Sequence, residues 1–215
     1  GLNLCFETRE GILKHCSRAN AQKLEQREPG GVGRRFLDRT QPSLEAQLCN
    51  LADEIAYNAH DIDDGVRSGL IGIEQLKEVE LFERFRREAV GEYPQLNGRR
   101  LLYETIRRML SSQVYDVIDA TRAALGDAAP ADGEAVRRCP RLVQFSPSMR
   151  AQSTELKRFL FANLYRHDRV VQTTTHAQQV VRELFAAYLA EPDQMPADYA
   201  QQDDTPRAVA DYIAG

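Results

Sequence analysis

The sequence predicts an all-α protein. Apolar residues recur at spacings of three and four along most of the chain, whereas strict alternation over the length of a strand is hard to find. The 215 residues are 42% hydrophobic and 28% charged, which is typical of a soluble globular protein and excludes collagen-like, low-complexity and wholly disordered classes. A chain of this length can bury one core, so we predict a single α-helical unit over residues 1–215.

The first part of the chain predicts a short helix and then a loop. In residues 2–16, Thr8 can cap a helix that runs through Lys14. Residues 17–41 are polar and carry Pro29 close to three glycines. Because these residue types interrupt regular structure, we predict a mobile surface loop at 17–41.

The next helix is the most informative one, over 42–69. Pro42 is tolerated in a first helical turn, because its missing N–H has no helical partner there. A second loop is predicted at 126–147, which holds three prolines and two glycines around a short extended piece, 142–145. Apolar spacing predicts the remaining helices at 74–88, 100–125, 149–167, 174–190 and 206–214, with a turn near 168–173.

The charge balance gives no general attraction to polyanions. The net charge is -4 and the pI is about 5.7. Only four of the 28 basic residues are lysines, and the arginines suit bidentate contacts with phosphate or carboxylate, although codon bias explains their excess equally well. Nucleic-acid binding through arginine pairs is one interpretation, and solvated helix faces with salt bridges are the other. The pairs are Arg34-Arg35, Arg86-Arg87, Arg99-Arg100, Arg107-Arg108 and Arg137-Arg138.

Cysteine usage and hydropathy indicate a reduced cytoplasmic protein without a membrane span. The four cysteines are far apart, with no CxxC spacing, which argues against a zinc ribbon or a redox motif. There is no run of about 18 apolar residues. The chain opens with Gly1 and has no methionine before Met109, so we expect it to be part of a longer protein.

The helix at 42–69 carries two ordered stripes. With Asp53 set to zero and about 100° added per residue, an apolar stripe falls between roughly 160° and 220°. Its members are Leu44, Leu48, Leu51, Ile55, Ile62 and Val66. A polar stripe falls between roughly -20° and 80° on the opposite side. Its members are Asp53, Tyr57, His60, Asp61 and Asp64.

Two interpretations of the polar stripe are open. It is either the solvent-exposed face of an amphipathic helix or a binding site. The stripe itself holds no lysine or arginine, so its three aspartates repel one another. Carboxylates beside a phenol ring and an imidazole suit a cation site or a sugar-binding wall, because carboxylate oxygens bind metals and accept from hydroxyls.

Several sequence blocks resemble the C-terminal half of the HD-domain deoxynucleoside triphosphate triphosphohydrolases, the dGTPase-like proteins. The central block reads Leu-Ala-Asp-Glu-Ile-Ala-Tyr-Asn-Ala-His-Asp-Ile-Asp-Asp-Gly at 51–65, after Pro-Ser-Leu-Glu-Ala-Gln at 42–47. The other blocks are Gly-Leu-Asn-Leu at 1–4, Glu-Gly-Ile-Leu-Lys-His at 10–15, Phe-Ala-Asn-Leu-Tyr-Arg-His at 161–167 and Arg-Ala-Val-Ala-Asp-Tyr-Ile-Ala-Gly at 207–215.

This resemblance implies an all-α, HD-domain-like enzyme that hydrolyses a dNTP to deoxynucleoside and tripolyphosphate with a divalent metal such as Mg²⁺ or Mn²⁺. Asp53 matches a metal ligand of the family. Tyr57 and Asp61 match residues that pack against the deoxyribose and bind its 3'-hydroxyl. Lys14 is similar to a lysine near the phosphates. The resemblance also implies dGTP as the favoured substrate and a homo-oligomer.

The resemblance implies that the other metal ligands and the catalytic residues precede the block at 1–4, so none of them is expected in this chain. His60-Asp61 is not the family's metal-binding doublet. One carboxylate cannot hold a catalytic metal alone, and we expect the 215-residue chain by itself to be inactive. Arg166 and His167 are further candidates for phosphate contacts. The alternative function is a non-catalytic helical module that binds nucleotides or subunits and has lost the metal half.

Overall fold

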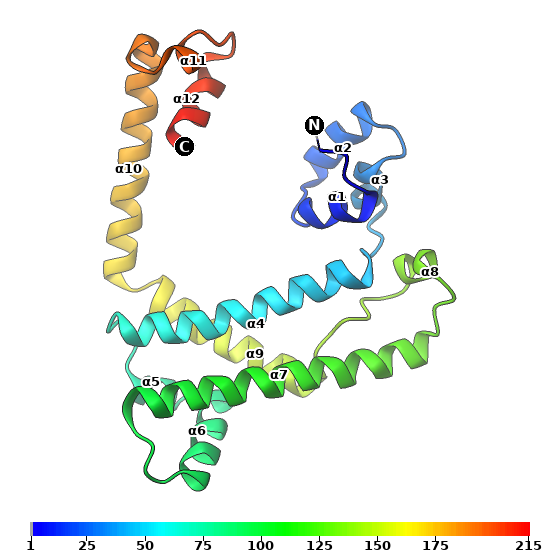
Figure 1. Cartoon of the computed structure of the whole chain (residues 1–215), viewed down its shortest axis with the longest axis vertical. Helices are drawn as coiled ribbons and strands as arrows, with labels where there is room; N and C mark the ends of the chain where they lie inside the picture. The colour runs from blue at the N-terminus through cyan, green and yellow to red at the C-terminus, as the bar shows by residue number, and fades with distance from the viewer. Residues whose placement is uncertain (1) are drawn as a thin grey trace. The chain divides into compact units, whose positions relative to one another are not determined.

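The computed structural model describes residues 2–215, and these residues contain helices and no strand. The prediction of an all-α fold is confirmed. Where we predicted one helical unit, the contacts separate two compact units, 1–160 and 161–215 (Figure 1). Each unit is described by itself below.

The first unit is built around two long helices. Helix α4 spans Leu44–Arg67 and α7 spans Gly98–Ala128, and these two helices pack against each other (Figure 1). The shorter helix α6, Glu80–Glu92, packs with α7, and α9, Pro147–Leu160, packs with α4 and α6. Apolar side chains from these four helices and from the segment before α9 fill the core. Its fully buried members include Ile62, Leu81, Phe82, Leu142, Leu156 and Leu160.

The prediction of a loop at 17–41 is wrong, because this region holds α2, Arg18–Arg27, and α3, Val32–Asp38. The hydroxyl of Ser17 accepts from the backbone N–H of Asn20 at 3.2 Å and caps α2. Gly33 lies so close to α2 that an added Cβ would sit 2.8 Å from the carbonyl oxygen of Ala21. At this position glycine serves close helix packing and not flexibility.

The other predicted boundaries shift for local reasons. Helix α1, Phe6–Ile12, starts two residues before Thr8, which is therefore not its cap. The loop predicted at 126–147 contains α8, Gly133–Arg138, whose cap is Asp132, accepting from Ala135 N at 2.7 Å. The helix predicted at 74–88 is two helices, α5 (Ile73–Leu76) and α6.

The second unit begins with a π-helical turn, Phe161–Tyr165, where we predicted a continuous α-helix from 149 to 167. The turn predicted at 168–173 lies earlier, at Arg166 and His167, because α10 already spans Asp168–Ala190. The hydroxyl of Thr173 donates to the carbonyl of Arg169 at 2.8 Å, so the threonine run is accommodated within the helix. Helix α12, Thr205–Ala214, packs on α10, with the rings of Tyr188 and Tyr212 5.1 Å apart. The remaining short elements are η2, Pro192–Gln194, and α11, Ala197–Ala200.

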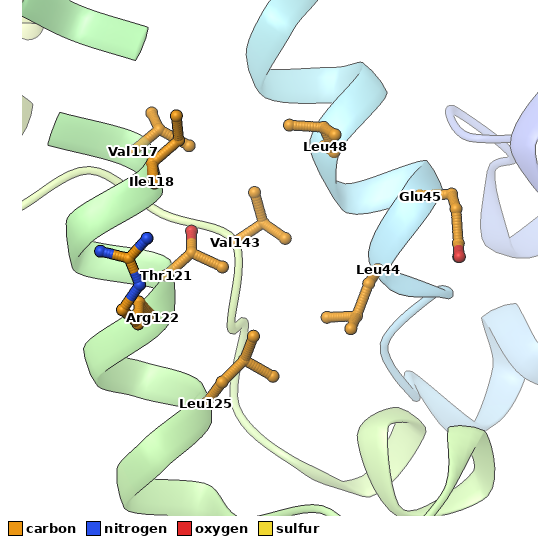
Figure 2. A pocket seen from close by; sticks show the side chains of 9 residues that line it. All are labelled: Leu44, Glu45, Leu48, Val117, Ile118, Thr121, Arg122, Leu125 and Val143. Atoms are coloured by element: carbon orange, nitrogen blue, oxygen red, sulfur yellow. The ribbon is translucent and has the colours of Figure 1, made fainter. Parts of the chain in front are cut away.

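The apolar stripe of α4 is buried only in part. Leu51, Ile55 and Ile62 are buried as predicted, whereas the side of α4 near its start is open and Leu48 is 51% exposed. There α4 and α7 border a groove of about 500 Å³ (Figure 2). Figure 2 shows Leu44 and Leu48 of α4 on one side, α7 on the other and Val143 between them. The helix pattern identifies the apolar face, but it does not show where a neighbouring helix ends its contact.

Two of the arginine pairs, one on α7 and one on α6, bind carboxylates within the chain. Arg107 and Arg108 each lie 2.7 Å from Glu104, and hydrogen bonds from them lower the pKa of Glu104 to about 2. The pair on α6 shares Glu83 in the same way. For these two pairs the salt-bridge interpretation is confirmed.

A buried glutamine attaches the segment before α9 to α4. The side-chain oxygen of Gln47 accepts from the backbone N–H groups of Leu142 and Val143 at 3.0 and 3.1 Å, and its amide donates to the carbonyl of Pro42 at 3.0 Å. Gln47 is 3% exposed. The segment predicted as an extended piece therefore has its backbone satisfied by a side chain and not by a sheet.

We expect Gln47→Leu to lower the free energy of unfolding of the chain by about 3 kcal/mol, because two buried N–H groups would lose their acceptor. Urea denaturation followed by circular dichroism measures this change. Gln22→Leu is the control, since Gln22 is exposed on α2, and it should change stability by less than about 0.5 kcal/mol. Equal effects of the two variants would show that Gln47 does not fasten the segment.

Candidate functional site

The candidate site lies on α4, whose ends are well defined by the sequence. The hydroxyl of Ser43 accepts from Ala46 N at 3.3 Å and caps the start of the helix. At the other end, Gly69 adopts φ +70°, a conformation that favours glycine, and ends the helix. Between them, 24 residues form one continuous helix on which side chains at i, i+4 and i+8 share a face.

The polar stripe predicted on this helix faces away from the buried core. Tyr57 is 61% exposed and the side chain of Asp53 is 49% exposed, whereas Asp61 is half-buried. Asp53 and Asp61 are eight residues apart, which corresponds to about 12 Å along the helix axis. This length suits a ligand of nucleoside size that lies along the helix.

The structure brings two of the predicted site residues together from distant parts of the sequence. Lys14 lies in the turn after α1, and its Nζ is 3.4 Å from Oδ2 of Asp53. Both side chains are partly exposed, so the pair remains accessible to a ligand. A cation and a carboxylate at one end of the stripe can contact a phosphate and a metal, respectively.

Residues outside the polar stripe compensate part of its negative charge. Besides the contact of Asp53 with Lys14, Asp64 forms an ion pair with Arg67 at 2.7 Å. The pairing of Asp64 with a residue three positions away is a local helix-surface contact. It distinguishes Asp64 from Asp53 and indicates that the candidate site covers the part of the stripe from Asp53 to Asp61.

A groove of about 640 Å³ adjoins this end of the stripe, between α1 and the start of α4. Lys14 lines it together with Cys49 and Asn50, which precede Asp53 by one helical turn. The ligand-accessible surface therefore continues past Asp53 toward the start of α4. Its other lining residues are Glu7, Thr8, Gly11, Ile12, Ser43, Glu45 and Ala46.

Sequence reasoning missed a polar cluster directly beside Asp53. Glu54 lies 2.7 Å from Nζ of Lys157 and 3.5 Å from Nη1 of Arg150, and it accepts from the hydroxyl of Ser153 at 3.3 Å. All three partners lie on α9, about 100 residues away in the chain. The only available signal was that Lys157 is one of the four lysines.

The remaining candidates, Arg166 and His167, belong to the second unit. Nδ1 of His167 accepts from the backbone N–H of Arg169 at 3.3 Å, which makes His167 the N-cap of α10. The guanidinium of Arg166 lies 5.0 Å above the ring of Phe161. Their predicted contacts with phosphate stay predictions.

The residues of this chain do not form a complete metal site. Within residues 2–215, no three His, Cys, Asp or Glu side chains are grouped so that they could hold a metal ion. His60 and Asp61 are adjacent on a helix and diverge by about 100°. Asp53 can therefore supply one ligand, whereas a bound metal needs about three or more from the protein.

Comparison with known proteins covers the whole chain. A family model described as a phosphohydrolase-associated domain matches residues 143–215. A deoxyguanosinetriphosphate triphosphohydrolase-like protein of Bordetella pertussis is 58% identical over 217 residues, which include 100% of this chain. This chain is a homologue of the deoxyguanosinetriphosphate triphosphohydrolase-like proteins. Relatives with the same name from Ralstonia nicotianae and Nitrosomonas europaea are 54% and 46% identical.

The chain spans about 55% of the length of these dGTPase-like relatives. The resemblance predicted from the blocks around Asp53 is confirmed by relatives that match the entire chain. In the described part of the chain, no helix is both long enough and apolar enough to cross a membrane.

Proposed function

We propose that this chain is the nucleotide-binding part of a dNTP triphosphohydrolase that releases a deoxynucleoside and inorganic tripolyphosphate. The observation that carries the proposal is the accessible stripe of Asp53, Tyr57 and Asp61, with Lys14 at its end, in a chain 58% identical to a dGTPase-like protein. The name of these relatives, deoxyguanosinetriphosphate triphosphohydrolase-like protein, favours dGTP as the substrate.

The stripe assigns a role to each side chain according to its chemistry. The exposed ring of Tyr57 offers an apolar face for the deoxyribose. The carboxylate of Asp61, one turn further along, accepts a hydrogen bond from the 3'-hydroxyl. Lys14, at the opposite end, donates to phosphate oxygens. These three contacts bind and orient the nucleotide along α4.

A divalent metal such as Mg²⁺ or Mn²⁺ belongs to the same proposal. When bound, it would supply electrostatic stabilisation of the reacting phosphate. Asp53 is the candidate ligand in this chain, and the other ligands would come from residues outside it. The 215-residue chain should therefore bind a nucleotide without hydrolysing it.

The test uses an extended protein, meaning this chain together with the part of the dGTPase-like relatives that it does not match. Each dNTP is incubated with this protein and Mg²⁺ or Mn²⁺, and the products are separated by ion-exchange chromatography. Deoxynucleoside and tripolyphosphate in equal amounts support the proposal. Nucleotide binding without turnover would instead support the alternative, a non-catalytic nucleotide-binding module.

Tyr57→Ala should raise the KM of the extended protein for its dNTP about tenfold, with a smaller change in kcat. The reason is that the ring contacts the sugar in the ground state and in the transition state alike. Steady-state kinetics measures both constants. Tyr115→Ala is the matched control, because Tyr115 is 67% exposed on α7, and it should leave KM unchanged. Equal KM values for the two variants would remove Tyr57 from the site.

A cytoplasmic homo-oligomer is a further part of the proposal. Helix α10 has no buried residue, and Val181 and Leu184 are 50% and 39% exposed on it. Exposed apolar surface of this kind supports a contact with another subunit. Light scattering of the purified protein gives the oligomeric state, and a monomeric mass would contradict this part.

A further inference from the structure

Glu54 and its partners on α9 form a cluster that places two cationic side chains beside the candidate site. Two cationic side chains, Lys157 and Arg150, share the single carboxylate of Glu54. The set therefore keeps one excess positive charge. The side chains of Lys157 and Arg150 are 44% and 40% exposed, whereas that of Glu54 is 20% exposed. The cations, and not the carboxylate, thus face outward.

Two buried residues, Ser153 and Phe145, hold the cluster in place. Ser153, which is 1% exposed, donates to Glu54 at 3.3 Å and fixes the carboxylate between α4 and α9. The guanidinium of Arg150 lies 5.1 Å from the ring centre of the buried Phe145. The carboxylate is thus held by a buried hydroxyl, and Arg150 has the ring of Phe145 as a second contact besides Glu54.

The position of Glu54 on α4 places this cluster beside the polar stripe. Glu54 follows Asp53 directly and precedes Asp61 by seven residues, so it lies on nearly the same line of the helix as Asp61. Helix α9 therefore runs along one edge of the stripe, while Lys14 of the first segment contacts its Asp53 end. The stripe is bordered by cations on two sides.

A polyphosphate needs such cations, because the stripe itself is acidic. A triphosphate carries several negative charges, and the carboxylates of Asp53 and Asp61 would repel it. Lys14 alone neutralises one charge and is already paired with Asp53. Lys157 and Arg150 supply two more donors at fixed positions. A lysine and an arginine together suit the non-bridging oxygens of adjacent phosphates.

We propose that Lys157 and Arg150 bind the polyphosphate part of the substrate. Glu54 positions these two side chains when no polyphosphate is bound. This inference rests on the proposed function for the identity of the ligand. Lys157 and Arg150 are substrate-binding residues, and Glu54 is a positioning residue.

The direct test measures binding of inorganic tripolyphosphate to the 215-residue chain by calorimetry at low ionic strength and without metal. Lys157→Ala should weaken binding about tenfold, and Lys157→Arg should restore most of it. Arg158→Ala is the matched control, because Arg158 is the next residue and is also exposed, and it should change affinity less than twofold. Circular dichroism establishes that each variant is folded.

Glu54→Gln separates a ligand-binding role from a purely structural one. Removing the carboxylate's charge leaves both cations for the ligand, so tripolyphosphate should bind several-fold more tightly. If the cluster served only to hold α4 against α9, Glu54→Gln would not increase the affinity for tripolyphosphate. The proposal is overturned if the wild-type chain does not bind tripolyphosphate, if Lys157→Ala and Arg158→Ala act equally, or if Glu54→Gln gives no increase.

The extended protein distinguishes this inference from the proposed function. If it hydrolyses dGTP and Lys157→Ala leaves its KM unchanged, the inference fails while the proposed function stands. If the chain binds tripolyphosphate through Lys157 but the extended protein hydrolyses no dNTP, the proposed function fails while the phosphate site remains.

Discussion

Glu10→Gln should lower the free energy of unfolding of the 215-residue chain by about 3 to 5 kcal/mol, because it removes the charge from a fully buried carboxylate. Glu10 is 1% exposed. Its Oε1 lies 2.7 Å from Nε of Arg35 and 2.8 Å from Nη1 of Arg137. The variant would remove the counter-charge of Arg35 and leave Arg137 with only the exposed carboxylates of Glu7 and Glu134.

The geometry around Glu10 makes the loss cooperative. Arg35 lies on α3 and Arg137 on α8, so one carboxylate joins three helices, and it also accepts from the backbone N–H of Ser43 at 3.4 Å. The Nε–H of Arg35 is not aligned for a hydrogen bond, so that contact is an ion pair. Burial lowers the pKa of Arg35, and the carboxylate of Glu10 opposes this shift.

Urea denaturation followed by circular dichroism measures the effect, with Glu7→Gln as the control. Glu7 is on the same helix and its carboxylate is 3.8 Å from Arg137, but its side chain is 58% exposed. It should contribute less than about 1 kcal/mol. If the two variants were equally stable, the buried network would not hold α1 in place, and the position of Lys14 would need another explanation.

Asp53→Ala should abolish release of tripolyphosphate by the extended protein, with a decrease of at least about a thousandfold in kcat. The reason is that loss of one anionic ligand from a catalytic metal removes both affinity for the metal and the electrostatic stabilisation that it supplies. Product formation from dGTP at saturating Mn²⁺ measures this effect. Binding of Mn²⁺, followed separately by calorimetry, should also weaken.

Asp64→Ala is the control for this experiment. Asp64 belongs to the same stripe, is exposed and has its contact with Arg67, so its loss should leave activity within about twofold. Retained activity in Asp53→Ala would remove Asp53 from the metal shell. Equal losses in both variants would indicate a general effect of charge on α4.

The sequence could predict α4 and its two faces because one helix is governed by local periodicity. The buried positions of Leu51, Ile55 and Ile62 follow from spacing alone. The same reasoning failed at Leu48, because its burial depends on how far α7 stays in contact with α4. Gly33 was misread because glycine permits both flexible loops and close packing.

The contacts that assemble the candidate site could not come from periodicity. Lys14 and Asp53 are 39 residues apart, and only the resemblance to a known family placed both at one site. Lys157 lies outside every sequence block that carries the resemblance, so its contact with Glu54 could not be predicted from them. Ion pairs between distant segments depend on the register of packed helices, which a single sequence does not specify.

The most direct test of the central claim compares the 215-residue chain and the extended protein in one assay with dGTP and Mn²⁺. The chain carries the stripe that we propose to bind the nucleotide but only one candidate metal ligand, Asp53. We expect tripolyphosphate from the extended protein and none above background from the chain. Metal-dependent release of tripolyphosphate by the 215-residue chain alone would contradict this account.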